Sequence, residues 1–540
     1  MSGSVCVAGI HHRHTDSIYT VGMAYFYVGG NRNQSFLLPV SMADWLEEGH
    51  LAWFVIDVVG TVDTSAFHAR HPNDGVGRPA YDPDMMLALL LYAYGTGLRS
   101  SRRIEAACGT DAAFRVIAGG VIPDHATIAR FLVDHQAAIE AVFVDVLALC
   151  AAAGLACVGT IAIDGAKVGA DAALDKNRGA DWIRQQVEAI VAEATVTDAA
   201  EDARPGLFGA LELPAELCTP KGRQARLEAA LAQIEAQDTA ARAAASERAE
   251  KARAAASQGR KLRGRKPKDP HAALARAEAD HAAALVRAEA DAASRAARQR
   301  AATADGRKLT GARPRPDDRV EQAAAALAAA RAGAAAANPV ATQANVTDPD
   351  SRIMKTKTSW VQGHNAQAAV NEHQIVVAAA VTQDANDVNQ YQPMVKAAAA
   401  AALAAAGITD PIGIVLADAG YWSDDNATAQ GPDRLIATLK DWKQRRAARD
   451  LGTTTGPPPN NASVLDAMEH RLRTPEGAQA YAKRSHTVEP VFGDHKENRG
   501  WLRFRRRGLD AVRSEWALMN TSHNLAKLFA HHKGRPAALT

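Results

Sequence analysis

A long stretch dominated by alanine, arginine, glutamate and aspartate constrains this chain more than any other feature of its sequence. It runs from residue 223 to about residue 337 of 540, broken only by basic segments with Gly and Pro near residues 259–270 and 306–316. This composition favours helices, but alanine buries little apolar surface and no leucine heptad persists. We therefore expect two or more long, partly exposed helices, inserted into a fold whose core comes from the flanking sequence.

The sequence before this stretch predicts a compact helical module. Apolar residues recur at helical spacing over residues 41–55, 83–95, 100–108 and 124–134, and Gly and Pro separate these runs. Pro83 stands where the first turn of a helix accepts proline. The pattern fits a helix-turn-helix that binds DNA, and it fits purely structural packing equally well.

Strand-like sequence lies on both sides of the insertion. Five apolar or β-branched runs predict strands, at residues 157–163, 361–370, 373–382, 411–418 and 433–440. A helix is expected over residues 391–406, and a basic helical region begins near residue 489. Strands and helices in this order argue for a mixed α/β layered fold.

The expected fold class is therefore α/β, a mixed sheet with helices, preceded by an all-helical domain and interrupted by a long Ala-rich helical insertion. Six segments follow: an N-terminal extension (1–35), a helical N-terminal domain expected to bind DNA (36–153), the start of the α/β core (154–222), the Ala-rich helical and basic insertion (223–345), the remainder of the core (346–530) and a tail (531–540).

Cysteine content and hydropathy exclude several classes of protein. Five cysteines in 540 residues, none in CxxC spacing, exclude a disulfide scaffold and disfavour a cysteine zinc site. No run reaches the roughly 18–20 apolar residues that span a bilayer. We expect no membrane contact, and a reducing cytoplasm as the compartment.

The formal net charge of +2 conceals a local excess of basic residues. Residues 481–540 hold twelve Lys/Arg and five Asp/Glu, and residues 259–268 hold six cations in ten. Local basic surface on a nearly neutral chain is typical of a face that meets a polyanion. A single basic run is also common as a solvated face or linker.

Three carboxylates stand where α/β folds build sites. Asp164 ends the first predicted strand, Asp418 ends the fourth, and Glu489 precedes Pro490 at the expected start of a helix. Each alone has a structural explanation, as a turn former or helix cap for the aspartates and as a helix-dipole charge for Glu489. Three oxygen donors without a nearby Cys or His cluster suit Mg²⁺ or Mn²⁺ better than zinc.

The residues around these carboxylates form a recognisable pattern. Tyr481-x2-Arg484-x4-Glu489-x6-Lys496, with Asp164-Gly165 and Asp418-Ala419-Gly420-Tyr421, resembles the DDE transposases of bacterial insertion sequences. Further matching residues are Tyr81-Asp82-Pro83, Leu91-Tyr92-Ala93-Tyr94, Ser100-Ser101-Arg102-Arg103-Ile104-Glu105, Pro123-Asp124-His125-Ala126-Thr127-Ile128-Ala129-Arg130-Phe131, Gly363-His364-Asn365-Ala366-Gln367 and Asn386-Asp387. The resemblance implies that the mixed sheet is an RNase H-like catalytic core.

The resemblance also implies a reaction and its residues. Divalent cations would support hydrolysis of a phosphodiester at each end of the element, and the freed 3′-hydroxyl would then attack target DNA. Asp164, Asp418 and Glu489 would hold two Mg²⁺ or Mn²⁺ ions, while Arg484 and Lys496 would bind DNA phosphates.

Tyr481 would position those phosphates or the terminal bases. The implied partners are double-stranded DNA, as terminal inverted repeats and as target, and a second copy of the chain in a homodimer on DNA. The implied location is the nucleoid, in the cytoplasm.

Other basic residues extend the expected DNA surface. Those near the C-terminus, where we expect Trp501 and Phe504 to lie in the core, are Arg499, Arg503 and Arg505. Arg263 and Arg265 resemble a hook that enters a narrow A·T-rich minor groove, and a flexible basic linker is the other interpretation.

The sequence departs from the family pattern in two places. Four residues separate Arg484 from Glu489 where three are commonest, and Ala166 stands where a small hydroxyl residue is expected. Two alternatives stay open beside the transposase: an inactive DNA-binding regulator derived from one, and an RNase H-fold nuclease without strand transfer.

Overall fold

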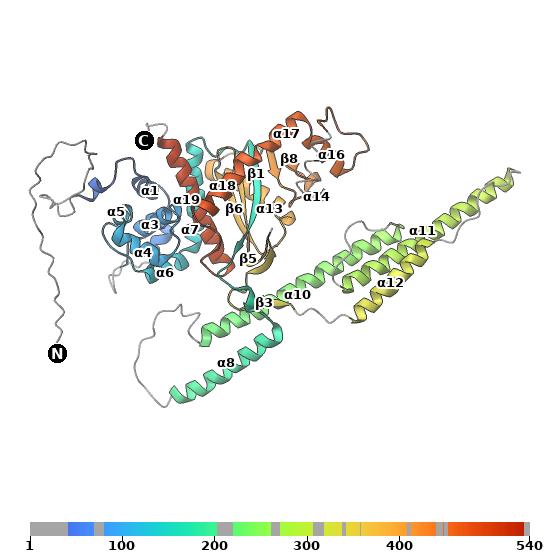
Figure 1. Ribbon diagram of the computed structural model, residues 1–540, viewed down its shortest axis with the longest axis horizontal. Coiled ribbons are helices and arrows are strands. Elements are labelled where there is room, and N and C mark those ends of the chain that lie inside the picture. The colour runs from blue at the N-terminus through green and yellow to red at the C-terminus, as the bar shows by residue number, and fades with distance from the viewer. Residues whose placement is uncertain are drawn as a thin grey trace, which may run out of the picture.

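The computed structural model describes residues 41–69, 80–201, 220–260, 270–305, 318–336, 342–356, 358–407, 412–438, 447 and 452–533. A mixed sheet lies at the centre, with a bundle of helices on one side and a long helical arm projecting on the other (Figure 1). Helices thus predominate at both ends of an α/β core.

The helices that precede the sheet pack around α3 (Pro83–Gly95), which is buried along most of its length. The Asp82 side chain caps this helix by accepting the Asp84 N–H, and Pro83 occupies the first turn as predicted. The other helices of this bundle are α1 (Leu51–Val59), α2 (Ser65–His68), α4 (Ser101–Thr110), α5 (Ala112–Ile117), α6 (His125–Asp134) and α7 (Gln136–Ala152).

The helix expected over residues 41–55 is broken. A 3₁₀ turn, η1 (Met42–Trp45), precedes α1, which begins after residue 50 because the His50 side chain accepts the Ala52 N–H as an N-cap.

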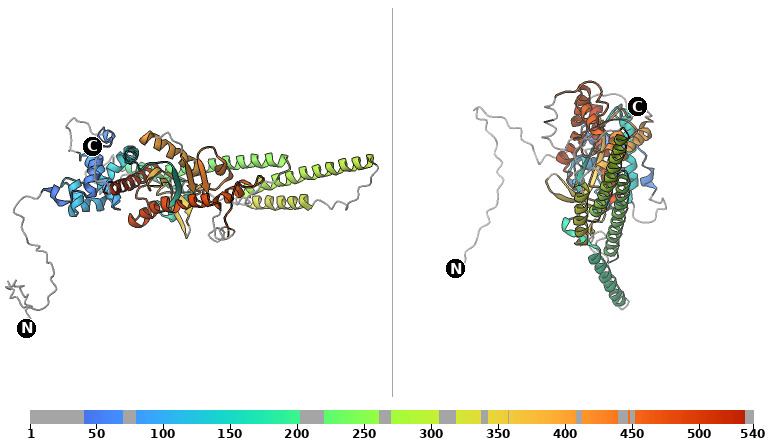
Figure 2. Two further views of the ribbon diagram at one scale, coloured as in Figure 1. Left: turned by 90° about the horizontal axis from the view of Figure 1, so that it is seen from above. Right: turned by 90° about the vertical axis from the view of Figure 1, so that its right-hand side faces the viewer.

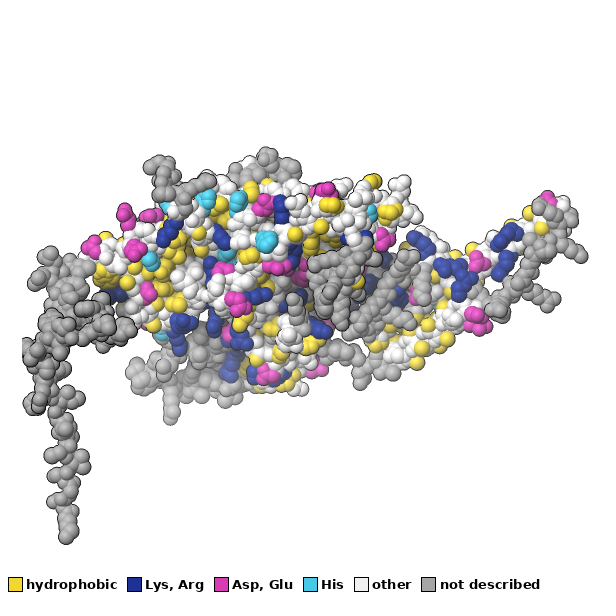
Figure 3. All heavy atoms as spheres, turned by 45° about the horizontal axis from the view of Figure 1, so that its top comes forward, with side chains coloured by type: hydrophobic (Ala, Val, Ile, Leu, Met, Phe, Trp, Pro, Cys, Tyr) yellow, Lys and Arg dark blue, Asp and Glu magenta, His cyan; other side chains and the backbone are white. Residues whose placement is uncertain are grey.

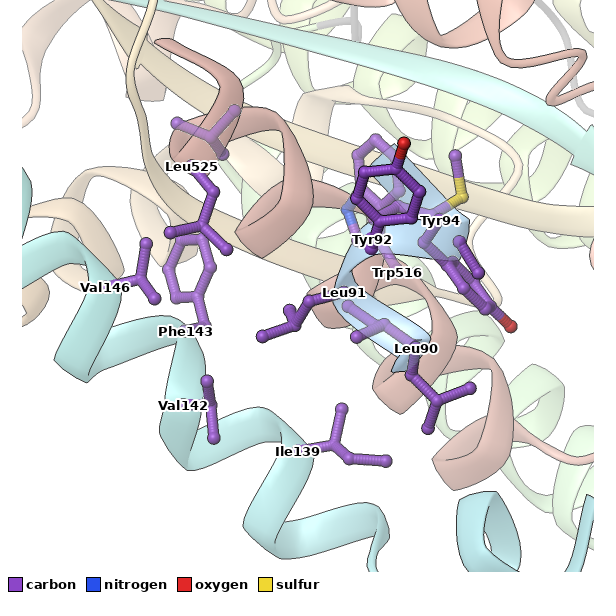
Figure 4. Close-up of a cluster of buried hydrophobic side chains, with 14 of the residues drawn as sticks. Leu90, Leu91, Tyr92, Tyr94, Ile139, Val142, Phe143, Val146, Trp516 and Leu525 are labelled. Carbon is purple, nitrogen blue, oxygen red and sulfur yellow. The ribbon is translucent and has the colours of Figure 1, made fainter. Parts of the chain in front are cut away.

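The bundle shares one apolar core with the last helix of the chain, α19 (Leu509–Lys533). Figure 4 shows where α3, α7 and α19 meet. The side chains that it labels there are Leu90, Leu91, Tyr92, Tyr94, Ile139, Val142, Phe143, Val146, Trp516 and Leu525. Residues more than 400 positions apart in the sequence therefore fold as one unit.

The central sheet has six strands. Its order is β4-β5-β1-β7-β8. β6 also pairs with β5, next to β4 along the same edge of that strand. β1 pairs antiparallel with β5 and parallel with β7, which pairs parallel with β8. The strands are β1 (Thr160–Gly169), β4 (Arg352–Lys355), β5 (Trp360–Asn371), β6 (Val376–Thr382), β7 (Ile414–Ala417) and β8 (Asp433–Ile436).

Alternation along the strands divides the sheet into two buried faces. Ile161 and Ile163 point into a cluster with α13 (Tyr391–Ala406), whose bounds match the predicted helix. Ala162 points into the opposite cluster, with α18 (Arg484–Gly493) and α19. The next residue of that parity on β1 is Asp164, so its side chain is directed to the face that α18 covers.

The remaining short elements connect these layers. They are η2 (Leu174–Lys176), η3 (Val388–Gln390), α14 (Asp424–Thr428), α16 (Val464–Leu472), α17 (Pro475–Ala482) and the π-helix η4 (Asp494–Asn498).

The arm is built from the long helices expected from the Ala-rich stretch: α10 (Pro220–Ser257), α11 (Pro270–Ala304) and α12 (Asp318–Ala336). A further long helix, α8 (Ala180–Glu201), precedes that stretch, in a segment expected to belong to the α/β core, and packs against α10. Ala252 and Ala256 of α10 pack against Ala279 and Ala283 of α11, and larger side chains, among them Leu227 and Ile234, are buried where α8 meets α10. Figure 2 shows the arm extending along the long axis of the molecule, and Figure 3 shows Lys and Arg side chains along it toward its far end.

A two-stranded ribbon joins the arm to the core. β2 (Asn177–Gly179) pairs antiparallel with β3 (Gln343–Asn345), so that Gly179 stands opposite Gln343. The chain therefore leaves for the arm and returns from it at adjacent points.

No single helix in the described residues is long and apolar enough to cross a membrane. By length and composition alone, the pair α6 and α7, bent by 76°, passes that test together.

Gly169 of β1 and Gly363 of β5 are paired where the two strands pack closely. A Cβ at Gly363 would lie 2.1 Å from the Val168 carbonyl oxygen, which is backbone and cannot rotate away. Gly363→Ala should destabilise the protein by about 1–3 kcal/mol, because overpacking forces the strands apart. Urea unfolding of the full chain measures this.

The matched control is Gly333→Ala on the exposed surface of α12, where an added Cβ meets nothing within 4 Å. Alanine is the better helix former there, so this variant should be at least as stable as the parent. A Gly363→Ala protein with unchanged stability would contradict the described β1–β5 packing.

Candidate active site

The parallel register of β1 and β7 brings two aspartates side by side. Ile163 pairs with Ala417, and Asp164 and Asp418 are the next residues on their strands. Asp418 follows the end of β7 as predicted. Asp164 was expected to end its strand, and this prediction was wrong. β1 continues to Gly169, because β5 pairs with it antiparallel over that length.

Glu489 lies in the second turn of α18 and not at the start of a helix, so the expectation from Pro490 was wrong. Proline inside a helix removes the N–H that would bond the carbonyl four residues earlier, here that of His486. The Gln374 side-chain amide donates to the His486 oxygen instead, at 2.8 Å. This substitute bond allows the helix to continue through Pro490.

Arg484 lies between the first and third carboxylates. Its guanidinium donates to Asp164 Oδ2 at 2.6 Å and to Glu489 Oε1 at 2.9 Å, and its side chain is 11% exposed. The family resemblance implies that Arg484 binds a DNA phosphate. In this structure it neutralises two carboxylates.

Burial dominates the electrostatics of Asp164. It raises the pKa of this carboxyl to about 6, and Arg484 opposes the rise because it favours the charged form. The carboxylates of Asp418 and Asp387 raise the pKa further by like-charge repulsion. Asp387 therefore belongs to the same electrostatic cluster.

Asp387 is a site residue that the sequence analysis did not assign a role. It lies just before η3, with Oδ1 accepting from Asn365 Nδ2 at 2.7 Å and from Gln367 Nε2 at 3.0 Å. Its Oδ2 lies 3.5 Å from Lys167 Nζ. The dipeptide Asn386-Asp387 matched the family pattern, but four residues separate Asp387 from the end of β6, so it does not stand out as a strand-end residue.

The donor set suits a hard divalent cation. Asp164, Asp418 and Glu489 offer only carboxylate oxygens, the ligands that Mg²⁺ and Mn²⁺ prefer. Gly420 leaves room beside them, since a Cβ there would lie 2.8 Å from Asp418 Oδ1 and 3.2 Å from Asp387 Oδ2. The residues present therefore fit the implied metal.

The three carboxylates lie in one region, but their oxygen atoms do not all lie within 4.8 Å of one another. Across the described part of the chain, the only group of three such side chains with ligand atoms within 4.8 Å of one another is His68, Asp82 and Asp84. That exposed group lies at the cap of α3, where capping accounts for Asp82. In the candidate site, Arg484 occupies the gap between Asp164 and Glu489.

The predicted DNA-contacting residues are divided between surface and interior. Lys496, Arg503 and Arg505 are exposed. Arg499 is only 7% exposed, and its Nε lies 2.8 Å from Asp494 Oδ2, so the structure does not place it on the surface with the other three, and its DNA contact stays a prediction. An internal ion pair holds this guanidinium away from the surface.

Tyr481 packs at the edge of the core and its hydroxyl donates to the Ala417 carbonyl at 3.3 Å, beside Asp418. Trp501 and Phe504 are fully buried, as expected. Arg263 and Arg265 lie outside the described residues.

Comparisons with known proteins identify both ends of the chain. A family model described as Transposase domain (DUF772) matches residues 40–134, and one described as Transposase DDE domain matches residues 442–529, which include Glu489. No curated protein and no solved structure matches the chain. A transposase domain over the first helices and a transposase DDE domain around the candidate glutamate together support a DDE transposase of an insertion sequence.

Proposed function

We propose that this transposase has an RNase H-like catalytic core that hydrolyses a phosphodiester at each end of its element and joins the freed 3′-hydroxyl to target DNA. The observation that carries the proposal is the β1–β7 register, which sets Asp164 beside Asp418 on the sheet face that α18 covers with Glu489. The match to a Transposase DDE domain around Glu489 supports the same assignment.

Asp164, Asp418 and Glu489 would hold two Mg²⁺ or Mn²⁺ ions, which when bound activate the attacking oxygen and stabilise the leaving oxygen of an in-line phosphoryl transfer. Arg484 balances the charge of Asp164 and Glu489 until the cations enter. With cations held by these carboxylates, its guanidinium would be available to bind a phosphate of the DNA strand, the role that the family pattern gives it.

DNA would lie across the exposed cations Lys496, Arg503 and Arg505. A buried carboxylate fixes the segment that carries two of them. The Glu515 carboxylate accepts the N–H groups of Arg505 and Arg506 at 2.9 and 3.1 Å. Two copies of the chain, one for each element end, would form a homodimer on nucleoid DNA.

The first test replaces the glutamate of the site. Glu489→Gln removes a negative charge at nearly constant shape, so cleavage of DNA bearing the inverted repeats that flank the gene should fall at least about a hundredfold in Mg²⁺ or Mn²⁺. DNA affinity, measured by fluorescence anisotropy, should stay within about threefold because binding rests on the basic surface.

Glu497→Gln is the matched control, an exposed glutamate eight residues further along. It should cleave like the parent protein. Cleavage retained in Glu489→Gln would remove Glu489 from the site. If the parent protein binds but does not cut in either metal, the chain is the regulator; if it nicks without joining, it is the nuclease.

A second test concerns the surface cations. Replacing Lys496, Arg503 and Arg505 with Gln should weaken DNA binding for all sequences and should flatten the plot of log affinity against log salt concentration. Each lost phosphate contact reduces the slope by about 0.9. Lys396→Gln, an exposed lysine on α13, is the control and should leave the slope unchanged. An unchanged slope in the triple variant would place the DNA elsewhere.

A further inference from the structure

Two buried amides hold the carboxylate of Asp387 in place, and within the described part of the chain neither amide forms a hydrogen bond with Asp164, Asp418 or Glu489. We propose that Asp387 is a fourth acidic residue of the site, its Oδ2 acting with Asp418 Oδ1 to hold one of the divalent cations. This inference rests on the proposed function, and it adds a ligand that the DDE pattern does not contain.

Hydrogen bonds fix the Oδ1 atom of Asp387. Asn365 and Gln367, both on β5 and both fully buried, point their amide N–H groups at this one oxygen. A buried amide is costly unless its hydrogen bonds are made, so the pair specifies an acceptor at this position. Two donors on one oxygen hold the carboxylate in a single orientation.

Further hydrogen bonds orient the two amide groups. The Tyr421 hydroxyl donates to Gln367 Oε1, and Gln367 Nε2 also donates to Asn365 Oδ1 at 3.1 Å. The Trp516 indole N–H donates to the Gln367 carbonyl at 3.0 Å, which ties this strand position to α19. Every polar atom of the Gln367 side chain is used, and the outcome is a rigid support beneath Asp387.

The other half of Asp387 faces the site. Its Oδ2 and Asp418 Oδ1 flank the same point, the position of a Cβ on Gly420, at 3.2 and 2.8 Å. Glycine leaves that point free of side-chain atoms. Like charges this close repel, and burial together with Asp164, Asp387 and Asp418 raises the pKa of the Tyr421 hydroxyl well above its ordinary value. A cation between the oxygens would turn this repulsion into binding.

Lys167 is the other candidate for the partner of Asp387. Its Nζ lies 3.5 Å from Oδ2, and its side chain is 23% exposed. At 3.5 Å this ion pair is longer than an ordinary hydrogen bond, so it is a weak reason for two buried amides to position the carboxylate. The two roles predict opposite effects when Lys167 is removed.

The experiment measures Mn²⁺ binding to the full chain without DNA, by the electron paramagnetic resonance signal of free Mn²⁺. Asp387→Asn keeps an oxygen for Asn365 and Gln367 and removes the charge, so its Kd for Mn²⁺ should rise at least about tenfold. Lys167→Gln removes a repelling cation, so Mn²⁺ should bind as tightly or more tightly. Asp384→Asn, an exposed aspartate in the same loop, should match the parent protein.

Gly420→Ala is a second variant that keeps every charge. Its methyl group would stand between Asp418 and Asp387, so Mn²⁺ binding should again weaken; it decides the question if Asp387→Asn does not fold, as checked by circular dichroism. Parent-like Mn²⁺ affinity in the folded variants overturns the inference. Equal weakening in Asp387→Asn and Lys167→Gln overturns it too, since Asp387 would then act through Lys167.

Glu489→Gln separates this inference from the proposed function. If Glu489→Gln weakens Mn²⁺ binding and Asp387→Asn does not, the fourth ligand is wrong and the triad stands. If the parent chain binds no Mn²⁺, the proposed function and the inference fail together.

Discussion

The parallel pairing of β1 with β7 sets Asp164 against Asp418 in a place from which most water is excluded, and much of the surrounding structure compensates for that. Uncompensated like charges at such a site would favour protonation or unfolding. Arg484 on α18 forms an ion pair with Asp164. The β5 amides donate hydrogen bonds to Asp387, and Lys167 forms an ion pair with it. The same groups that make the charges tolerable also fix their directions, which a metal site requires.

The two regions that resemble transposase domains are not independent. Arg99, which follows α3, donates to the carbonyls of Gly500 and Arg503 and forms a buried ion pair with Glu515 of α19. Glu515 in turn holds the N–H groups of the basic segment. The position of the exposed segment that carries Arg503 and Arg505 therefore depends on a buried contact with the N-terminal bundle.

Much of this arrangement could be predicted from the sequence. Hydrophobic periodicity predicted α3 and α13 with their observed bounds, and strand-like runs predicted the sheet strands that flank the site, because local patterns determine both. The three family carboxylates could be assigned from motif residues. The triad as a metal site, and the DNA contacts of the exposed cations, stay predictions.

What could not be predicted depends on partners far away in the sequence. β1 extends past Asp164 because β5 pairs with it, and α18 continues through Pro490 because Gln374 replaces a lost donor. Arg499 is internal because Asp494 and the folded core surround it. Asp387 was passed over for the same reason, since the amides that orient it come from a strand some twenty residues earlier.

The ribbon of β2 and β3 has a consequence for how this chain can change over time. Because Gly179 and Gln343 are neighbours, everything between them is attached to the core at one short stem. Insertion, loss or exchange of the whole arm as a cassette would leave each strand of the central sheet in register. The arm is therefore the part of the molecule whose length can change without moving the sheet and its carboxylates.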